Sequence, residues 1–175
     1  KDEKDVHEDM ALEPLTDYSR FKADCEQMLF EFETPTFTGV TIRPATVCGF
    51  SPRQRLDVVV NILTNLAYHK REITVFGGEQ LRPNIHIVDM VEAYLVLLKA
   101  PSEKIAGQIF NAGYENQPVA ELAQTIKEVV GNDVRLVTTF TDDNRSYHIS
   151  SKRIRDNLGF AATHSIGEAA VDLLQ

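Results

Sequence analysis

The hydrophobic positions of this chain change their spacing from segment to segment, which predicts alternating helices and strands. Apolar residues recur at helical spacing from Thr16 to about Phe32, and Thr34-Pro35 ends that helix. Residues 37–47 have the pattern of a buried strand. The same reasoning predicts further helices over residues 56–67, 88–98, 118–130, 151–158 and 165–174, and further strands over 73–76, 108–111 and 134–140. Because strands alternate with helices, we predict an α/β fold with a mainly parallel sheet.

The composition is that of an ordinary globular protein. The 175 residues are 43% hydrophobic and 25% charged, and they suffice for one core or for a core with a small lobe. No run approaches the roughly 20 apolar residues of a membrane span, so we expect no membrane partner and a cytoplasmic location. The net charge of −8 disfavours nucleic acid as a partner, because binding phosphates needs clustered Lys and Arg.

The acidic residues and the cysteines refine this picture. Residues 1–17 contain 7 acidic and 2 basic residues, so we expect this stretch to be a solvated loop. Cys25 and Cys48 fall on a predicted helix face and a predicted strand end, which suits reduced packing residues better than a disulfide framework. No His, Cys and Asp residues have the spacing of a metal site.

The start of the first predicted helix carries a candidate acid/base pair. Tyr18 and Lys22 are four residues apart and therefore share a helix face. An ammonium group one turn away lowers the proton affinity of a phenol, which would make Tyr18 a usable general acid and base near neutral pH. Phe21 and Cys25 point elsewhere on the helix and are expected in the core. The alternative is a solvated Tyr–Lys pair, so the remaining segments have to decide.

Further motifs follow this pair along the chain. They are TIRPATVCG at residues 41–49, VFGGEQLRPNIHIVD at 75–89, NRSY at 144–147 and NLGF at 157–160. Together with Tyr18 and Lys22 they resemble the extended short-chain dehydrogenases/reductases that act on nucleotide-diphosphate sugars, namely the NAD-dependent sugar epimerases and dehydratases. The resemblance covers nearly the whole chain.

The resemblance implies roles for individual residues. Tyr18 would take a proton from a sugar hydroxyl while the carbon beneath it delivers hydride to the nicotinamide ring, and Lys22 would also bond the nicotinamide ribose. The implied cofactor is NAD, with NADP not excluded, and the implied substrate is a nucleotide-diphosphate sugar bound by a homodimeric full-length enzyme. Pro44 and Ala45 would meet the cofactor at the end of a strand. The implied substrate contacts are Thr46, Asn61, Val75, Phe76, Arg82 and Arg145, the two arginines clamping the diphosphate.

Several of these residues also have a purely structural interpretation. Pro44 can simply end a strand, Phe76 can belong to the core, and Arg145 can form a surface ion pair worth little energy. His86 and Asp89, in the same motif as Arg82, are expected to be architectural because apolar residues flank the histidine.

One part of the family pattern is absent from this sequence. The family begins with a strand, a glycine-rich turn and a helix whose N-terminus holds the cofactor pyrophosphate, whereas Gly77-Gly78 lead into Pro83 rather than into a helix. The catalytic Ser or Thr of the family has no match either. We therefore interpret the chain as the C-terminal portion of a longer enzyme: part of a Rossmann-like doubly wound parallel sheet plus a small α/β substrate-binding lobe.

This interpretation predicts both domains and function. Residues 1–50 would be the remainder of the NAD-binding domain, and residues 51–175 would form mainly the substrate-binding lobe, with about 85–113 returning to the Rossmann domain. The expected function is NAD-dependent epimerisation of a nucleotide-diphosphate sugar through a transient keto intermediate, the fragment being inactive alone. The alternatives are a 4,6-dehydratase or reductase of the same family, or a non-catalytic fragment that binds sugar nucleotides.

Overall fold

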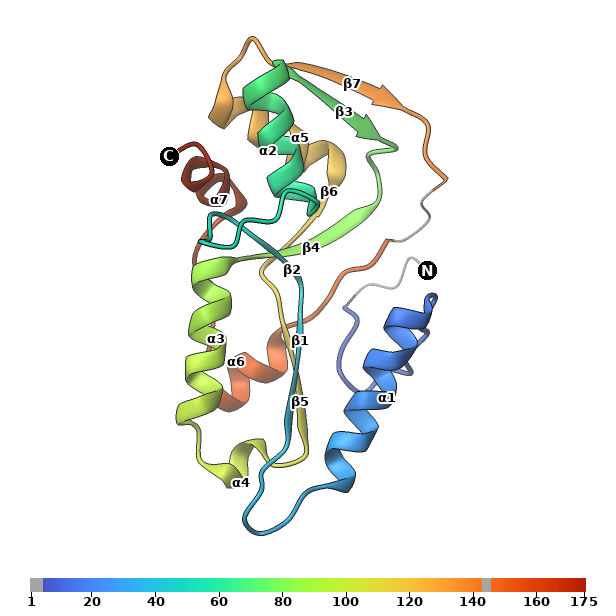
Figure 1. Cartoon of the computed structure of the whole chain (residues 1–175), viewed down its shortest axis with the longest axis vertical. Coiled ribbons are helices and arrows are strands. Elements are labelled where there is room, and N and C mark those ends of the chain that lie inside the picture. Colours follow the sequence, from blue (N-terminus) through green and yellow to red (C-terminus); the bar gives the residue numbers. More distant parts are fainter. Residues whose placement is uncertain (1–4, 143–145) are drawn as a thin grey trace.

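The structure is a computed structural model that describes residues 5–142 and 146–175. Helices and strands alternate along the chain (Figure 1). The helices are α1 (Asp17–Glu31), α2 (Val59–Lys70), α3 (Ile87–Lys99), α4 (Ser102–Ile105), α5 (Val119–Val130), α6 (Lys152–Leu158) and α7 (Ile166–Asp172). The strands are β1 (Val40–Pro44), β2 (Thr46–Cys48), β3 (Glu72–Phe76), β4 (Leu81–His86), β5 (Gln108–Ala112), β6 (Glu115–Pro118) and β7 (Arg135–Thr139).

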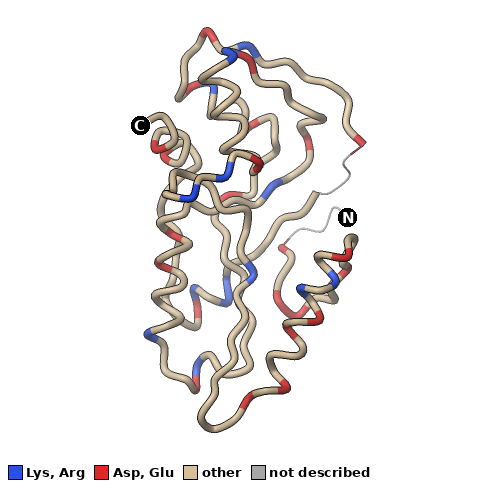
Figure 2. The backbone as a smooth tube through the Cα atoms, in the orientation of Figure 1, with Lys and Arg blue, Asp and Glu red and all other residues tan. Residues whose placement is uncertain are grey.

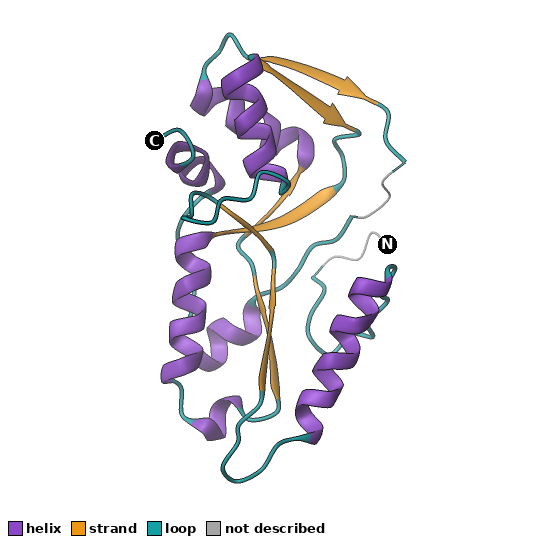
Figure 3. Cartoon of the chain, in the orientation of Figure 1, coloured by secondary structure: helices purple, strands orange, loops and turns teal. Residues whose placement is uncertain are grey.

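Parallel pairing dominates among the described strands, as predicted. β1 pairs with β5, with Val40 opposite Gln108 and Pro44 opposite Ala112. β2 pairs in parallel with β4, and β3 with β7. The exception is β6, which runs antiparallel to β4. In the view of Figure 3, α3 and α6 lie on one side of the β1–β5 pair and α1 on the other, and α2 and α5 lie beside the β3–β7 pair. The α/β fold class is therefore confirmed.

The lower hydrophobic cluster lies where α3, α4 and α6 cover the β1–β5 pair, in the lower half of Figure 1. Its largest member is Phe110, which is completely buried on β5. Because α6 contributes to this cluster, a helix near the C-terminus packs with elements from the middle of the chain. The buried members are Ala45, Ile85, Met90, Ala93, Leu97, Ile105, Phe110, Ala112, Ile154 and Phe160.

The upper hydrophobic cluster lies among α2, α5 and α7 and against β3. Helix α5 shows why the sequence folds here: Pro118 caps its start and Gly131, at φ 150°, ends it. Its apolar positions point to α2 and α7. The buried members are Cys48, Val60, Leu63, Ala67, Ile73, Val75, Val119, Leu122, Ala123, Ile126, Val134, Ile166, Ala169 and Ala170. None of the described helices has the length and apolar character needed to cross a membrane.

Helix α1 differs from the prediction in its packing. None of its residues is buried, and most of its apolar side chains lie on the surface. The expectation that Phe21 and Cys25 belong to the core is wrong, because Phe21 is 69% exposed and Cys25 is exposed as well. Leu29, which lies close to Gly39, is the half-buried member of the predicted apolar face.

The acidic stretch before α1 also differs from the expected solvated loop. Acidic residues are spread along this segment and along α1 (Figure 2), but Glu8 is only 5% exposed. Its Oε1 accepts a hydrogen bond from the backbone N–H of Asn111 at 2.8 Å, and its Oε2 lies 3.6 Å from Nε of Arg153. Val6 forms an isolated parallel bridge with Ile149. The segment around Val6 and Glu8 is therefore packed near β5 and α6, whereas most of residues 9–17 are exposed as expected.

Two strands were not predicted. β4 contains Pro83 and Asn84, and β6 consists of Glu115-Asn116-Gln117-Pro118, so neither has the apolar composition of a typical strand. β4 nevertheless lies between β2 and β6, and its last four residues are buried. Tertiary pairing decides these two strands, because their own sequences do not favour them.

Candidate active site

Helix α1 places the predicted acid/base pair near its beginning. Thr16 caps the helix: its Oγ1 accepts a hydrogen bond from the N–H of Ser19 at 3.2 Å, and Ser19 Oγ accepts one from the N–H of Thr16 at 3.0 Å. Tyr18 therefore lies in the first turn, and Lys22 follows one turn later. The Tyr18 side chain is 75% exposed, so its phenol is accessible to a ligand.

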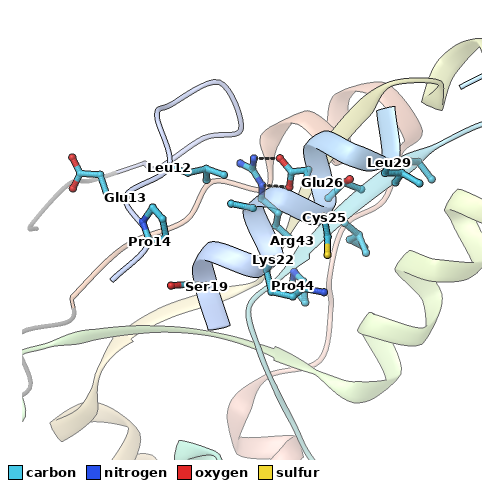
Figure 4. A pocket seen from close by; sticks show the side chains of 14 residues that line it. Leu12, Glu13, Pro14, Ser19, Lys22, Cys25, Glu26, Leu29, Arg43 and Pro44 are labelled. Carbon is cyan, nitrogen blue, oxygen red and sulfur yellow. Dashed lines mark hydrogen bonds and ion pairs between the residues drawn. The ribbon is translucent and has the colours of Figure 1, made fainter. Parts of the chain in front are cut away.

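A pocket of about 560 Å³ lies between α1 and β1. Lys22 and Ser19 line it from the helix, and Arg43 and Pro44 line it from the end of the strand (Figure 4). The structure thus brings together two of the predicted site positions, Lys22 and Pro44, from separate segments. Since ligands in parallel sheets bind at the carboxyl ends of strands, this is the expected end of β1.

Ala45 and Thr46 continue from this strand end. Ala45 is buried, and its N–H donates to the carbonyl oxygen of Ala112 at 2.7 Å. It also lines a smaller neighbouring pocket that shares Arg43 and Pro44 with the first. Thr46 is half-buried on β2, opposite Asn84 of β4.

The residues expected along the nucleotide lie on β3 and β4. Val75 is only 2% exposed and its side chain belongs to the upper cluster, so it can offer a ligand its backbone alone. Phe76 is 58% exposed at the end of β3. Arg82 is half-buried on β4 opposite Gln117, and its Nη1 donates to the carbonyl oxygen of Leu81 at 3.1 Å. In Figure 1 the end of β3 and the start of β4 lie on the same side of the molecule as the start of α1. Arg145 lies outside the described residues.

Asn61 shapes a loop rather than presenting its amide to the outside. It is 4% exposed on α2. Its Oδ1 accepts from the N–H of Gly49 at 3.1 Å, and its Nδ2 donates to the carbonyl oxygen of Arg55 at 2.8 Å. These contacts hold the segment after β2 against α2, and they occupy the amide that we expected to face the substrate.

His86 and Asp89 have architectural contacts, as predicted. His86 is 2% exposed and caps α3, because its Nδ1 accepts from the N–H of Val88 at 3.1 Å. Its Nε2 lies 3.2 Å from Oδ2 of Asp172, without hydrogen-bond geometry. Asp89 accepts hydrogen bonds from the segment before α7, and the bond from the His164 ring raises the pKa of that imidazole. Among the described residues, no group of three or more His, Cys, Asp or Glu could hold a metal ion.

Sequence reasoning missed two acidic residues close to this site. Glu26, on α1, forms an ion pair with Arg43, and Glu8 receives the N–H of Asn111. The sequence could have indicated Glu26 as a site residue, because it follows Lys22 by one helical turn and lies on the same helix face. No sequence pattern could have indicated Glu8, since its partner Asn111 is 103 positions away.

Comparison with known proteins supplies the family. The pattern of the NAD dependent epimerase/dehydratase family matches residues 1–113, which is more than half of the chain. The chain belongs to this family. It is 26% identical over 180 residues to UDP-glucose 4-epimerase of Azospirillum brasilense, covering 91% of this chain and 51% of that protein. It is 29% identical to human dTDP-D-glucose 4,6-dehydratase, covering 87% of this chain and 45% of the relative. The chain thus spans about half the length of the curated relatives it matches.

Solved structures of the family agree with the fold. A UDP-glucose 4-epimerase from Thermotoga maritima, solved with UDP-glucose, superposes with a TM-score of 0.86 at 23% identity, over 99% of this chain and 57% of that one. A dTDP-glucose 4,6-dehydratase from Bacillus anthracis, in complex with NAD, superposes with a TM-score of 0.82 at 17% identity. The match covers 99% of this chain and 56% of that one. These similarities confirm a Rossmann-like α/β fold.

Proposed function

We propose that this chain supplies the acid/base pair and part of the sugar-nucleotide site of an NAD-dependent enzyme that epimerises a nucleotide-diphosphate sugar. The observation that carries the proposal is that Lys22 and Pro44 line one pocket, with Tyr18 one turn before Lys22 on the same helix. Family membership supports the class of reaction.

Tyr18 is the proton-transfer group in this proposal. As phenolate it takes a proton from a sugar hydroxyl, and as phenol it returns one when the sugar is re-formed. The ammonium of Lys22 favours the phenolate through its charge. The high exposure of Tyr18 leaves room for a sugar ring to reach it.

The pocket between α1 and β1 fits one end of a nicotinamide cofactor. Lys22 and Ser19 offer donors to a ribose. Pro44 and Ala45 can offer only carbonyl oxygens from the backbone at the strand end, because Pro44 has no N–H and that of Ala45 donates to Ala112. The sequence contains no match to the turn that holds a pyrophosphate, so this chain provides the nicotinamide side of the site and not the whole of it. When bound, NAD or NADP would accept a hydride from the sugar and give it back.

The substrate side of the site lies toward β2, β3 and β4. Thr46 follows the strand end directly, and Phe76 presents an exposed ring that suits contact with a base or ribose. Arg82 supplies a guanidinium for the diphosphate, and Arg145 is proposed as its partner on the sequence alone. Asn61 is not proposed as a ligand contact, because its amide is engaged by Gly49 and Arg55. Val75 contributes its backbone only, because its side chain lies in the upper cluster.

The two hydrophobic clusters support the proposed division of the chain in part. Residues 40–47 and 85–112 contribute to the lower cluster, whereas α2, β3, α5 and α7 form most of the upper one, which also includes Cys48. The lower cluster also recruits α6. We propose the lower cluster as the remainder of the cofactor domain and the upper cluster as the substrate-binding lobe.

The test is product analysis with the full-length enzyme, supplied with NAD and either UDP-glucose or dTDP-glucose. An epimerase returns a sugar nucleotide of unchanged mass whose anomeric proton signal differs. A 4,6-dehydratase gives a product lighter by one water. A reductase, tested in a parallel assay with NADH or NADPH and a keto-sugar nucleotide, consumes the reduced cofactor in step with product. Unchanged substrate under all of these conditions, with the cofactor bound, would favour the non-catalytic alternative.

A further inference from the structure

The helix that carries Tyr18 and Lys22 packs against the rest of the molecule without a fully buried residue. Its half-buried apolar residues are Ala23, Leu29 and Phe30. Much of its apolar face is exposed, as the 69% exposure of Phe21 shows. Because so little apolar surface is buried, polar contacts carry a large share of the restraint on where the helix lies over β1.

The strongest of these contacts joins Glu26 to Arg43. Arg43 Nη2 lies 2.5 Å from Oε1 of Glu26, and Arg43 Nε donates to Oε2 at 3.0 Å. Figure 4 shows the two side chains pointing toward each other from α1 and β1, joined by both bonds. The side chains are only 12% and 23% exposed for Glu26 and Arg43. A bidentate bond between planar groups fixes direction as well as distance.

Arg43 is itself held in a rigid frame. Its Nη1 donates to the backbone carbonyl oxygen of Glu8 at 3.3 Å. The buried carboxylate of Glu8 accepts the N–H of Asn111, which is the residue opposite Arg43 in the β1–β5 pair. The guanidinium is thereby tied to two strands and to the segment before α1, so it can act as a fixed point for the helix.

The positions of these residues along the chain connect the contact to the candidate site. Tyr18, Lys22 and Glu26 follow one another at intervals of one helical turn. An ion pair at Glu26 therefore restrains the rotation of the helix about its axis and its position along that axis, and with them the placement of Tyr18 and Lys22. Arg43 directly precedes Pro44 and Ala45. One ion pair thus links the acid/base helix to the strand end that lines the same pocket.

We propose that Arg43, which lines the pocket but whose guanidinium is engaged by Glu26 and by the Glu8 carbonyl oxygen, is a positioning residue: acting through Glu26, it sets Tyr18 and Lys22 over the end of β1. The proposal rests on the function proposed above as far as Tyr18 and Lys22 are concerned. It predicts a loss in the chemical step rather than in binding, because a displacement of about 1 Å of a catalytic group costs about 10²-fold in rate.

The first experiment measures the position of the helix and needs no activity. Cys25 is exposed on α1 beside Glu26, and Cys48 is buried, so a spin label attaches at Cys25 alone. A second label at Glu103→Cys, exposed on α4, gives a distance distribution by pulsed electron resonance. We expect a narrow distribution in the parent chain, a broader one in Arg43→Lys and in the milder Glu26→Gln, and recovery in the exchanged pair Glu26→Arg with Arg43→Glu.

The matched control lies on the same helix. Arg20 pairs with Asp17 within α1, where both side chains are largely exposed, so Arg20→Ala removes an ion pair that does not reach β1. Its distribution should stay narrow. The positioning role would be overturned if the distance distributions of both Arg43→Lys and Glu26→Gln were as narrow as that of the parent chain while circular dichroism showed an intact fold.

The second experiment measures turnover in the full-length enzyme. We expect Arg43→Lys to lower kcat about tenfold or more while KM for the sugar nucleotide stays within about twofold, and the exchanged pair to recover part of kcat. A raised KM with unchanged kcat would mean that Arg43 binds ligand instead. If the parent enzyme shows no turnover, the proposed function fails, whereas the distance measurement still decides whether Arg43 positions α1.

Discussion

Asp89 and His164 are joined twice. Oδ2 of the buried Asp89 accepts the backbone N–H of His164 at 2.8 Å, and Oδ1 lies 2.8 Å from Nδ1 of the same residue's ring. Oδ2 also accepts the N–H of Thr163 at 3.0 Å. One carboxylate in the first turn of α3 thus anchors the segment that leads into α7, and through α7 the upper cluster.

Replacing this carboxylate should release the C-terminal segment. We expect Asp89→Ala to lower the free energy of unfolding by about 1.5–3 kcal/mol, the usual value for a hydrogen bond to a charged group, because the donors of Thr163 and His164 lose their charged acceptor. Urea unfolding followed by circular dichroism measures the loss, and hydrogen exchange at residues 163 and 164 locates it. Glu92→Ala, exposed on the same helix, is the control and should change neither.

The same contact makes the docking of this segment depend on pH. The hydrogen bond to Asp89 raises the pKa of His164. Because the pKa of His164 is raised in the folded state, its bond to Asp89 contributes fully to the stability of the fold below the ordinary pKa of 6.5. This contribution is lost as the pH rises through the pKa that His164 has in the folded chain. Ring titration by NMR should show a lower His164 pKa in Asp89→Asn than in the parent chain. Identical titration curves would show that Asp89 does not act on the ring.

The two cysteines should differ sharply in reactivity. Cys25 is exposed, whereas Cys48 is 1% exposed and burial raises the pKa of its thiol to about 12. Because the thiolate is the nucleophile, a disulfide reagent at pH 8 should titrate one thiol in the native chain and two after denaturation. Cys25→Ser should then give no rapid reaction. Two fast thiols in the native chain would contradict the packing of Cys48.

Tyr18→Phe tests the proton-transfer role directly. In the full-length enzyme we expect kcat to fall by about 10²–10⁴-fold, the range for general acid–base catalysis, with ligand binding nearly intact. Tyr68→Phe removes a hydroxyl from an exposed tyrosine on α2 and should leave kcat unchanged. If Tyr18→Phe kept more than about a tenth of the parental rate, Tyr18 would not be the proton-transfer group.

Arg82 tests the class of substrate. Arg82→Ala should weaken the binding of a nucleoside diphosphate by about 1.5–3 kcal/mol, and Arg82→Lys should recover only part of this loss because an ammonium lacks the planar fork. Calorimetric titration without the sugar isolates the diphosphate, and the affinity for the nicotinamide cofactor should not change. Arg155→Ala, exposed on α6 and paired with its neighbour Asp156, is the control. Equal affinities in all variants would place the diphosphate elsewhere.

The sequence predicted the elements whose signals are local. Pro118 and Gly131 bracket α5, and Thr16 starts α1 with its capping box, so these helices were found close to their observed bounds. β4 was missed because Pro83 and Asn84 disfavour a strand and only the pairing with β2 and β6 overrides them. Tyr18, Lys22 and Pro44 were predicted from their motifs, and the structure places Lys22 and Pro44 in one pocket. Glu8 and the contacts of Asn61 were not, since they depend on partners that only the folded chain brings near.

Within the described ranges, two helices follow a strand with no loop between them, and this limits how the chain can vary in length. His86 is both the last residue of β4 and the cap of α3, and Pro118 is both the last residue of β6 and the cap of α5. Deleting one residue at either junction would turn the strand's side chains to the opposite face and rotate the helix by about 100°. Natural insertions and deletions should therefore fall in connections that have a loop, such as those between α1 and β1 and between β2 and α2, and homologous sequences should keep a constant length across both junctions.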